Sequence, residues 1–457
     1  MKKKIKTGIL FCTLTLLLAG MVACQKNEFV PFDGNVDSYV YNYADFMDAP
    51  QKEWEEDIIY AVDVLMKKHP SLVNANSYVY EDGKRSLENF YDEALHQQFI
   101  EDVNALLKNL PNYNEAQMEF ELQRIFATLN DGHTAFLADV GENMPIGFEL
   151  FYENGEPMYY VYMVPKGEEH LLFSKLEAID GIRVEALIER MKPYVSAEGN
   201  ALKEALLTVY FRSKESLQAI GVMGLENDQV RYTLRLPDGS TNIITLEAYN
   251  QTEYEEVSRV SKSLKKLQIG RFKHPESVYW HEFWEDENIV YAHVSQCEQD
   301  ESYPFGKFCG EIMELLAEDE SRELIFDLRG NSGGIYPLDR FEELVEFLKQ
   351  RKGGKVYVLI DGNVYSSTVL MASHFKQELP QAVLVGTPAG QSPNCFGPLT
   401  EDKMPNSGKS FYYTVRFYRM WPEYNEKELM PDIMMYQTIE DYMEGKDTIL
   451  ETLRTGK

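Results

Sequence analysis

The sequence predicts an α/β protein in three parts: an N-terminal helical region (50–140), a β-rich module (141–270) and a C-terminal α/β core (271–457). Three observations support this. The first part has apolar residues at helical spacing, and the second has short alternating segments separated by glycine-containing turns. The third alternates short apolar runs with amphipathic stretches. The chain has 457 residues and is 44% hydrophobic, which is typical of an ordered globular protein with a sizeable core.

The first 24 residues predict a signal peptide. Basic residues 2–6 precede an apolar run, 8–20, which is too short to span a bilayer comfortably and ends at Met21-Val-Ala-Cys24. This segment resembles the bacterial lipobox, which implies removal of residues 1–23 and lipid attachment at Cys24. Polar residues 24–49 then form a tether. The expected location is the cell envelope, outside the cytoplasm, with membrane contact only through the lipid. The alternative is an ordinary secretory signal with a chance cysteine.

The N-terminal region contains two stripes, that is, two sets of apolar residues at helical spacing. The first predicts a helix that His69-Pro70 ends, and the second predicts a helix that leads into Asn130-Asp-Gly-His-Thr134. Gly132 stands where a helix C-cap is expected, so His133 would follow a helix end directly. The stripes consist of Ile58, Val62, Leu65 and Met66, and of Met118, Leu122, Ile125, Phe126 and Leu129.

In segments such as 158–162 and 230–236 of the β-rich module, apolar and polar residues alternate as in half-buried strands. One helix is expected in this module, near 184–193. In the C-terminal core, the helical stripe of Phe341, Leu344, Val345 and Leu348 lies among short apolar runs. This alternation predicts βαβ units and a largely parallel sheet with both faces covered. The runs are Ile289–Val294, Leu324–Leu328, Val356–Ile360 and Ala382–Val385.

The net charge of −29 argues against nucleic-acid binding, which needs basic patches that displace phosphate counterions. Beyond the signal peptide, Cys297, Cys309 and Cys395 are spaced too widely for a zinc signature, and Cys309 falls on an apolar face. The sequence contains no HExxH, P-loop or dinucleotide-binding glycine motif. We therefore predict neither a cofactor nor a metal.

A nucleophile and an oxyanion hole are predicted where two strands end. The strand at 324–328 runs into Arg329-Gly-Asn-Ser-Gly-Gly334, and the strand at 356–360 leads to Ser366 and Ser367 before a helix-like run. A serine at such a turn presents its hydroxyl at a helix N-terminus, where N–H groups stabilise negative charge. The alternative is an ordinary N-cap serine. The segment 330–334 is called the glycine loop below. Asp327 and Arg329 are expected to anchor it through buried contacts.

His133 has the most suggestive context for the base. His374 lies on the same predicted helix as Ser366, about 12 Å along its axis, beyond hydrogen-bond reach. The pattern Ser373-His-Phe-Lys376 lacks the supporting elements of penicillin-binding enzymes. His133 projects from a tight turn after a helix, although a loop histidine without catalytic function is the alternative.

These motifs, together with Val385-Gly-Thr-Pro388 and Met430-Pro-Asp-Ile433, resemble the tail-specific (C-terminal processing) serine peptidase family. Leu129-Asn-Asp-Gly-His-Thr134 points to its tricorn-like branch, and Ile179-Asp-Gly181 is similar to a turn of the family's PDZ-like module. The resemblance implies a crotonase/ClpP-like α/β peptidase core after a PDZ-like module. It also implies a role for each of the motif residues: Ser366 as nucleophile, His133 as general base, and the N–H groups of Ser367, Gly333 and Gly334 as oxyanion donors.

The family's Ser/Lys branch carries a lysine in the loop after Val385-Gly-Thr-Pro388, and this chain reads Ala-Gly-Gln-Ser there. That mechanism is disfavoured. The acid that orients the histidine is expected shortly before the Pro-Asp strand, where Glu423 and Glu426 are both candidates. We predict a peptidase that acts on a peptide or protein substrate. The alternative is an inactive peptidase-like lipoprotein that binds peptide or another ligand, because Val364-Tyr365 and Thr387 depart from the family pattern.

Overall fold

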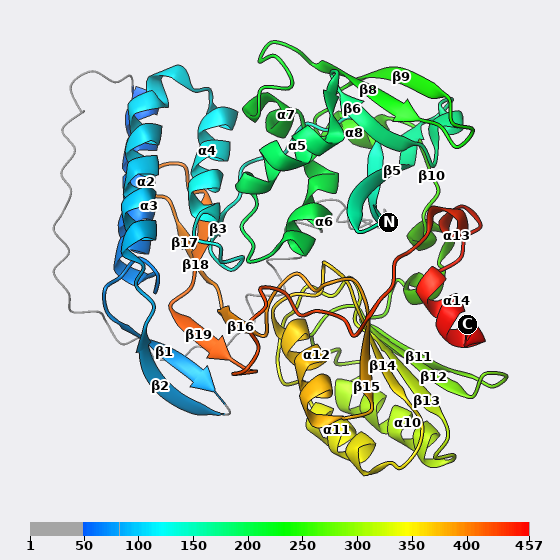
Figure 1. Ribbon diagram of the computed structural model, residues 1–457. Coiled ribbons are helices and arrows are strands. Elements are labelled where there is room, and N and C mark those ends of the chain that lie inside the picture. Colours follow the sequence, from blue (N-terminus) through cyan, green and yellow to red (C-terminus); the bar gives the residue numbers. More distant parts are fainter. Residues whose placement is uncertain (1–48, 82, 457) are drawn as a thin grey trace, which may run out of the picture. The chain divides into compact units, whose positions relative to one another are not determined.

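The computed structural model describes residues 49–81 and 83–456 (Figure 1). The predicted signal peptide, Cys24 and the tether through residue 48 lie outside these ranges. The described chain forms two compact units, one from 274–393 with 420–435, and one from 49–273, 394–419 and 436–456. Helices and several sheets alternate along the chain, and the predicted mixed α/β fold is confirmed. Within the described ranges, no helix is both long and apolar enough to cross a bilayer.

The first unit is built on a six-stranded sheet in the order β11-β12-β13-β14-β15-β20. Neighbouring strands from β12 to β20 pair in parallel, and β11 is an antiparallel edge strand. The four predicted core strands are present. The strands are β11 (Tyr279–Trp284), β12 (Ile289–Val294), β13 (Glu323–Asp327), β14 (Val356–Ile360), β15 (Ala382–Gly386) and β20 (Ile433–Met434).

Helices α10 (Phe305–Ala317), α11 (Phe341–Gln350) and α12 (Ser367–Glu378) contribute to one apolar core with the sheet. Alternate residues of a strand face opposite sides. Leu324 and Phe326 join this helix-covered core, so Asp327 faces the opposite side of the sheet. Parallel strands place their carboxyl ends at one edge, which brings the segments after β13 and β14 together.

The second unit begins with α2 (Ala49–Lys68), α3 (Glu93–Asn109) and α4 (Glu115–Ala127), which share an apolar core. The predicted stripes are confirmed, and α2 ends just before His69-Pro70. The hairpin of β1 (Asn76–Glu81) and β2 (Lys84–Asn89), which was not predicted, interrupts the helices of this region. β1 pairs in parallel with β19 (Arg416–Arg419), a strand from a distant part of the sequence.

The β-rich module contains a seven-stranded antiparallel sheet. Its strands are β4 (Gly147–Glu153), β5 (Glu156–Pro165), β6 (Lys175–Ile179), β7 (Ile182–Arg183), β8 (Gln229–Arg235), β9 (Thr241–Glu247) and β10 (Arg259–Ser261). The expected helix is present as α5 (Val184–Met191), but the prediction of a single helix is wrong. Side-chain caps at Ser213, Asn250 and Ser263 start short helices. These helices are too short to be recognised from the spacing of apolar residues. The additional helices are α6 (Asn200–Tyr210), α7 (Lys214–Ala219), α8 (Gln251–Glu256) and α9 (Leu264–Leu267).

Two small sheets complete the second unit. β16 (Asn394–Phe396) lies at the edge of the sheet β16-β19-β1-β2, and β3 (Ala135–Phe136) pairs with β18 (Ser410–Tyr413), which pairs with β17 (Thr400–Lys403). Helices α13 (Ile439–Met443) and α14 (Thr448–Thr455) follow, and Tyr442 packs edge-on against Phe151 of the module. Single 3-10 turns lie at Leu110–Asn112, Glu169–Leu171, Lys192–Tyr194 and Gly270–Phe272.

Candidate active site

Ser366 stands at a strained turn between β14 and α12. Its φ of 52° and ψ of −127° lie outside the regions that residues with a side chain normally occupy. Such a turn exposes the hydroxyl of a serine at the end of a strand, as in a nucleophile elbow. Ser366 is partly exposed, and Ser367 begins α12, so the Ser367 N–H lies outside the hydrogen-bond ladder of the helix.

Gln391 holds this turn in place. Its Oε1 accepts a hydrogen bond from the Ser366 N–H at 3.0 Å, and its Nε2 donates to the Tyr365 hydroxyl at 3.0 Å. Gln391 is fully buried, and its backbone carbonyl accepts from the Leu429 N–H at 2.9 Å. Gln391 belongs to the loop after β15, in which the Ser/Lys branch of the peptidase family that the sequence resembles carries a lysine. The sequence showed only that the lysine is missing, and the role of Gln391 was not predicted.

The glycine loop lies directly against Ser366. A Cβ at Gly333 would come within 2.7 Å of the Ser366 Cβ and 3.0 Å of the Tyr365 carbonyl oxygen. A Cβ at Gly334 would come within 2.1 Å of the Cys297 carbonyl oxygen. Both glycines also have positive φ, +112° and +133°, which a side chain disfavours. The loop can therefore approach the serine only with glycine at these two positions.

The predicted oxyanion donors are not equivalent. The Gly333 N–H donates to Asn331 Oδ1 at 3.0 Å, so a substrate oxygen would compete with that side chain. The Gly334 carbonyl accepts from Ser367 Oγ at 2.6 Å, which ties the loop to the first residue of α12. Ser366, Ser367, Gly333 and Gly334 are thus brought together in the first unit.

Asp327 and Arg329 form the buried anchor of this loop, as predicted. Arg329 donates from Nε to Asp327 Oδ1 at 2.9 Å and from Nη2 to Oδ2 at 2.6 Å. The Tyr291 hydroxyl also donates to Asp327 Oδ2, at 2.9 Å. Side-chain exposure is 7% for Arg329 and 0% for Asp327, so removal of either partner would leave a buried uncompensated charge.

The His133 turn is held by Asp131 in the second unit. α4 ends at Ala127, and the left-handed residue after it is Asn130, with φ 50°, so the prediction of Gly132 as C-cap is wrong. An asparagine adopts this conformation more readily than most residues with a side chain. Asp131 Oδ1 accepts the His133 N–H at 2.9 Å, and this contact fixes the backbone of the turn.

The other carboxylate oxygen of Asp131 accepts three further contacts. Oδ2 accepts from the hydroxyls of Thr134 and Thr414, both at 2.7 Å, and from His69 Nε2 at 3.3 Å. Burial alone would raise the pKa of Asp131, but the hydrogen bond and charge of His69, together with His133 and Thr134, hold it below its usual value. Asp131 is therefore ionised and fully engaged.

The His133 ring is buried, with 2% of the residue exposed, and it makes a hydrogen bond with the Phe396 backbone on β16. Burial lowers the pKa of His133, and the Asp131 charge and the Phe396 contact offset part of that effect. The imidazole is therefore neutral near pH 7, the form that a general base requires.

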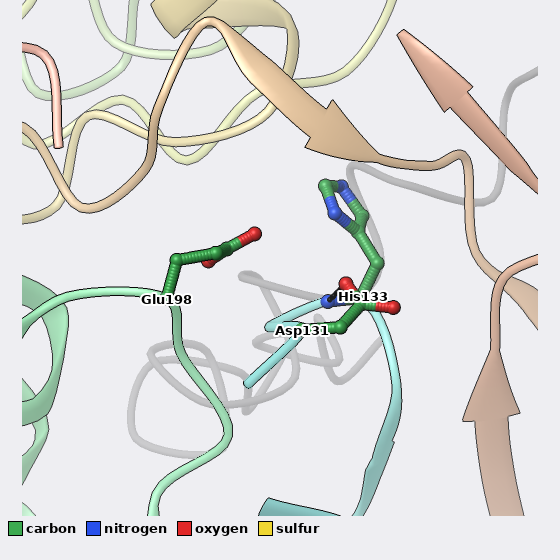
Figure 2. A group of neighbouring side chains, drawn as sticks. All are labelled: Asp131, His133 and Glu198. Atoms are coloured by element: carbon green, nitrogen blue, oxygen red, sulfur yellow. Dashed lines mark hydrogen bonds between the residues drawn. The ribbon is translucent and has the colours of Figure 1, made fainter. Parts of the chain in front are cut away.

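Glu198, which no sequence motif indicated, lies near His133 and Asp131. It lies in the loop between the 3-10 turn Lys192–Tyr194 and α6, and its side chain extends toward the His133 ring (Figure 2). Potential ligand atoms of Asp131, His133 and Glu198 lie within 4.8 Å of one another. We do not interpret the group as a metal centre, because Asp131 already accepts four donors and offers little to a cation.

The remaining predicted residues are described within the unit that holds each of them. Glu423 and Glu426 are exposed on the segment 420–435 of the first unit. His133 belongs to the second unit and Ser366 to the first, so their pairing stays a prediction. His374 contacts the Tyr336 hydroxyl through Nδ1 at 3.0 Å, in keeping with its exclusion as the base. Cys297, Cys309 and Cys395 are free and buried.

No protein-family model matches this chain, and no curated protein matches its sequence. Solved structures do match. The structure of mature CPAF complexed with lactacystin has 12% sequence identity and a TM-score of 0.60, over 90% of this chain and 100% of that chain. A crystal structure of mature CPAF has 12% identity and a TM-score of 0.59, over 90% and 99%. The photosystem II D1 C-terminal processing protease gives 14% identity over 85% and 94%, with a TM-score of only 0.38. The chain thus has a fold like that of CPAF.

Proposed function

We propose that this chain is a serine peptidase of the cell envelope that hydrolyses bonds in peptide or protein substrates. The observation that carries the proposal is the strained turn of Ser366 with the glycine loop packed against it. Strain at a partly exposed serine indicates a functional constraint. The likeness of the fold to CPAF, a serine protease, supports the same reaction class.

In the proposed reaction, Ser366 Oγ attacks the substrate carbonyl while the neutral His133 imidazole takes the hydroxyl proton. The tetrahedral oxyanion forms beside the Ser367 N–H and the glycine loop. The imidazolium then gives its proton to the leaving amine, and water hydrolyses the acyl-enzyme with the same histidine as base. The mechanism requires Ser366 and His133 to reach hydrogen-bond distance in the substrate complex.

A fluorophosphonate probe tests the nucleophile in the intact protein. The wild type should be labelled, and Ser366→Ala and His133→Asn should lose nearly all labelling. Ser373→Ala is a matched control, since this buried serine of α12 bonds only its own helix, from Oγ to the Val369 carbonyl at 2.7 Å. Failure to label the folded wild type, or equal labelling of Ser366→Ala, would overturn the assignment.

A second candidate is a peptidase-like protein that binds peptide or another ligand without cleaving it. The contact between the Gly333 N–H and Asn331 Oδ1 favours this alternative, because it occupies one predicted oxyanion donor. Asn331→Ala separates the two proposals. The labelling rate should be maintained or rise if Asn331 competes with the substrate oxygen, and labelling should stay absent in both proteins if there is no catalysis.

We also propose that Cys24 carries the lipid that attaches the chain to the cell envelope. Metabolic labelling with a fatty acid should mark the wild type, and Cys24→Ser should be unlabelled and released from the membrane fraction. Cys395→Ser serves as the control, because Cys395 is buried and free within the fold. Membrane release without loss of the fatty-acid signal would contradict the attachment site.

A further inference from the structure

A neutral histidine base needs a partner that stabilises the imidazolium formed in the reaction. The charge of Asp131 favours that protonated ring, but the hydrogen bonds of this carboxylate are made to other groups. Its Oδ1 accepts the backbone N–H of His133, and its Oδ2 accepts Thr134, Thr414 and His69. These four contacts use the carboxylate to shape the turn. They are made to the backbone of His133 and to other residues, not to the His133 ring.

Glu198 is the other carboxylate near the ring. It comes from a different element, and its oxygen lies within 4.8 Å of a ring nitrogen of His133 and of an Asp131 oxygen. Cys395 on β16 is near enough to be affected by both carboxylates. Burial, followed by the charges of Glu198 and Asp131, raises the pKa of the Cys395 thiol well above its usual value, so that thiol is neutral. The charged and titratable groups around His133 are therefore Asp131, Glu198, the neutral Cys395 and, through Asp131, His69.

The Glu198 loop and the His133 turn are attached to one side chain of α4. Gln123 Nε2 donates to the Tyr194 carbonyl at 2.6 Å, just before the loop, and to the Tyr210 hydroxyl of α6 at 2.8 Å, beyond it. Gln123 Oε1 accepts the Ala138 N–H at 2.8 Å, shortly after His133. Gln123 is 2% exposed. A buried amide with three such contacts fixes the separation of the two segments.

We propose that Glu198 is the positioning residue for His133, whose imidazolium it stabilises after proton transfer from Ser366. This inference rests on the proposed function, and Glu423 and Glu426, which are exposed on the first unit, stay predictions. The carboxylate acts through its charge and through the orientation of the ring, and it does not touch the substrate. A negative charge at this distance favours the protonated form of the histidine.

The test compares Glu198→Gln with Glu198→Asp and with Glu189→Gln, a control carboxylate whose side chain is 78% exposed on α5. The first readout is the pKa of His133 by NMR of histidine-labelled protein in a Ser366→Ala background, with the resonance assigned by His133→Asn. Loss of the Glu198 charge should lower the pKa of His133 by roughly 1 unit. Glu198→Asp should restore part of the shift, and Glu189→Gln should leave the pKa unchanged.

The second readout is the pH profile of the fluorophosphonate labelling rate. Glu198→Gln should move the acid limb to lower pH and reduce the plateau rate about tenfold or more. A wild-type His133 pKa in Glu198→Gln would overturn the pairing, and so would a wild-type labelling profile. If the folded wild type is never labelled and the NMR shift still appears, the pairing stands and the proposed peptidase function fails.

Discussion

Gly333→Ala tests whether contact between the glycine loop and Ser366 sets the geometry of the nucleophile. The added Cβ would lie 2.7 Å from the Ser366 Cβ, and ordinary contact begins at 3.4 Å, so the two segments must separate by about 0.7 Å. The φ of +112° adds strain of roughly 1–3 kcal/mol. Overpacking adds roughly 1–3 kcal/mol more. We expect a free energy of unfolding about 2–6 kcal/mol lower than that of the wild type.

The displacement of the glycine loop from Ser366 should affect the rate of reaction at Ser366 more than it affects folding. A misplacement of about 1 Å can reduce a rate about 100-fold, so labelling of Gly333→Ala should fall by roughly that factor at temperatures where the protein stays folded. Gly354→Ala is the matched control: its φ is +72° and its Cβ would lie 2.0 Å from the Arg322 carbonyl oxygen, before β14 begins. This variant should lose stability but label normally once folded. Full labelling of folded Gly333→Ala would refute the reasoning.

Three further outcomes are expected. Gln391→Met should leave the Ser366 N–H without its acceptor. The free energy of unfolding, measured by denaturant melts, should fall by about 1–3 kcal/mol, and the labelling rate should be lower than that of the wild type. Because burial lowers the pKa of His133, the acid limb of the labelling rate should lie below pH 6.5. The stability that the neutral imidazole contributes should be lost as pH falls through that lowered pKa. A midpoint of the acid limb above pH 6.5 would contradict the neutral state assigned to His133. EDTA should leave labelling unchanged, because Asp131 is already engaged by four donors, and a loss that zinc restores would contradict this view.

Local patterns predicted much of the fold. The strands of the first unit are short apolar runs of residues buried on both faces, and their alternation with helices indicates parallel pairing without knowledge of the partners. Errors arose where a distant segment decides the structure. β1 pairs with β19 through Tyr78 and Arg416, and no window of sequence includes both. The C-cap error had a local cause, since Asn130 rather than Gly132 took the left-handed conformation.

The sequence by itself determined the nucleophile side of the candidate site. Adjacent parallel strands end at the same edge of the sheet, so the glycine loop after β13 and Ser366 after β14 must meet once those strands pair. Only the tertiary structure decided how that side is held and what surrounds His133. Gln391 and Thr414 make their contacts, and Glu198 comes near His133, across separations at which no periodicity survives, such as 283 residues between Thr414 and Asp131. Backbone pairing repeats and leaves a pattern in the sequence, whereas a single side-chain contact between distant segments leaves none.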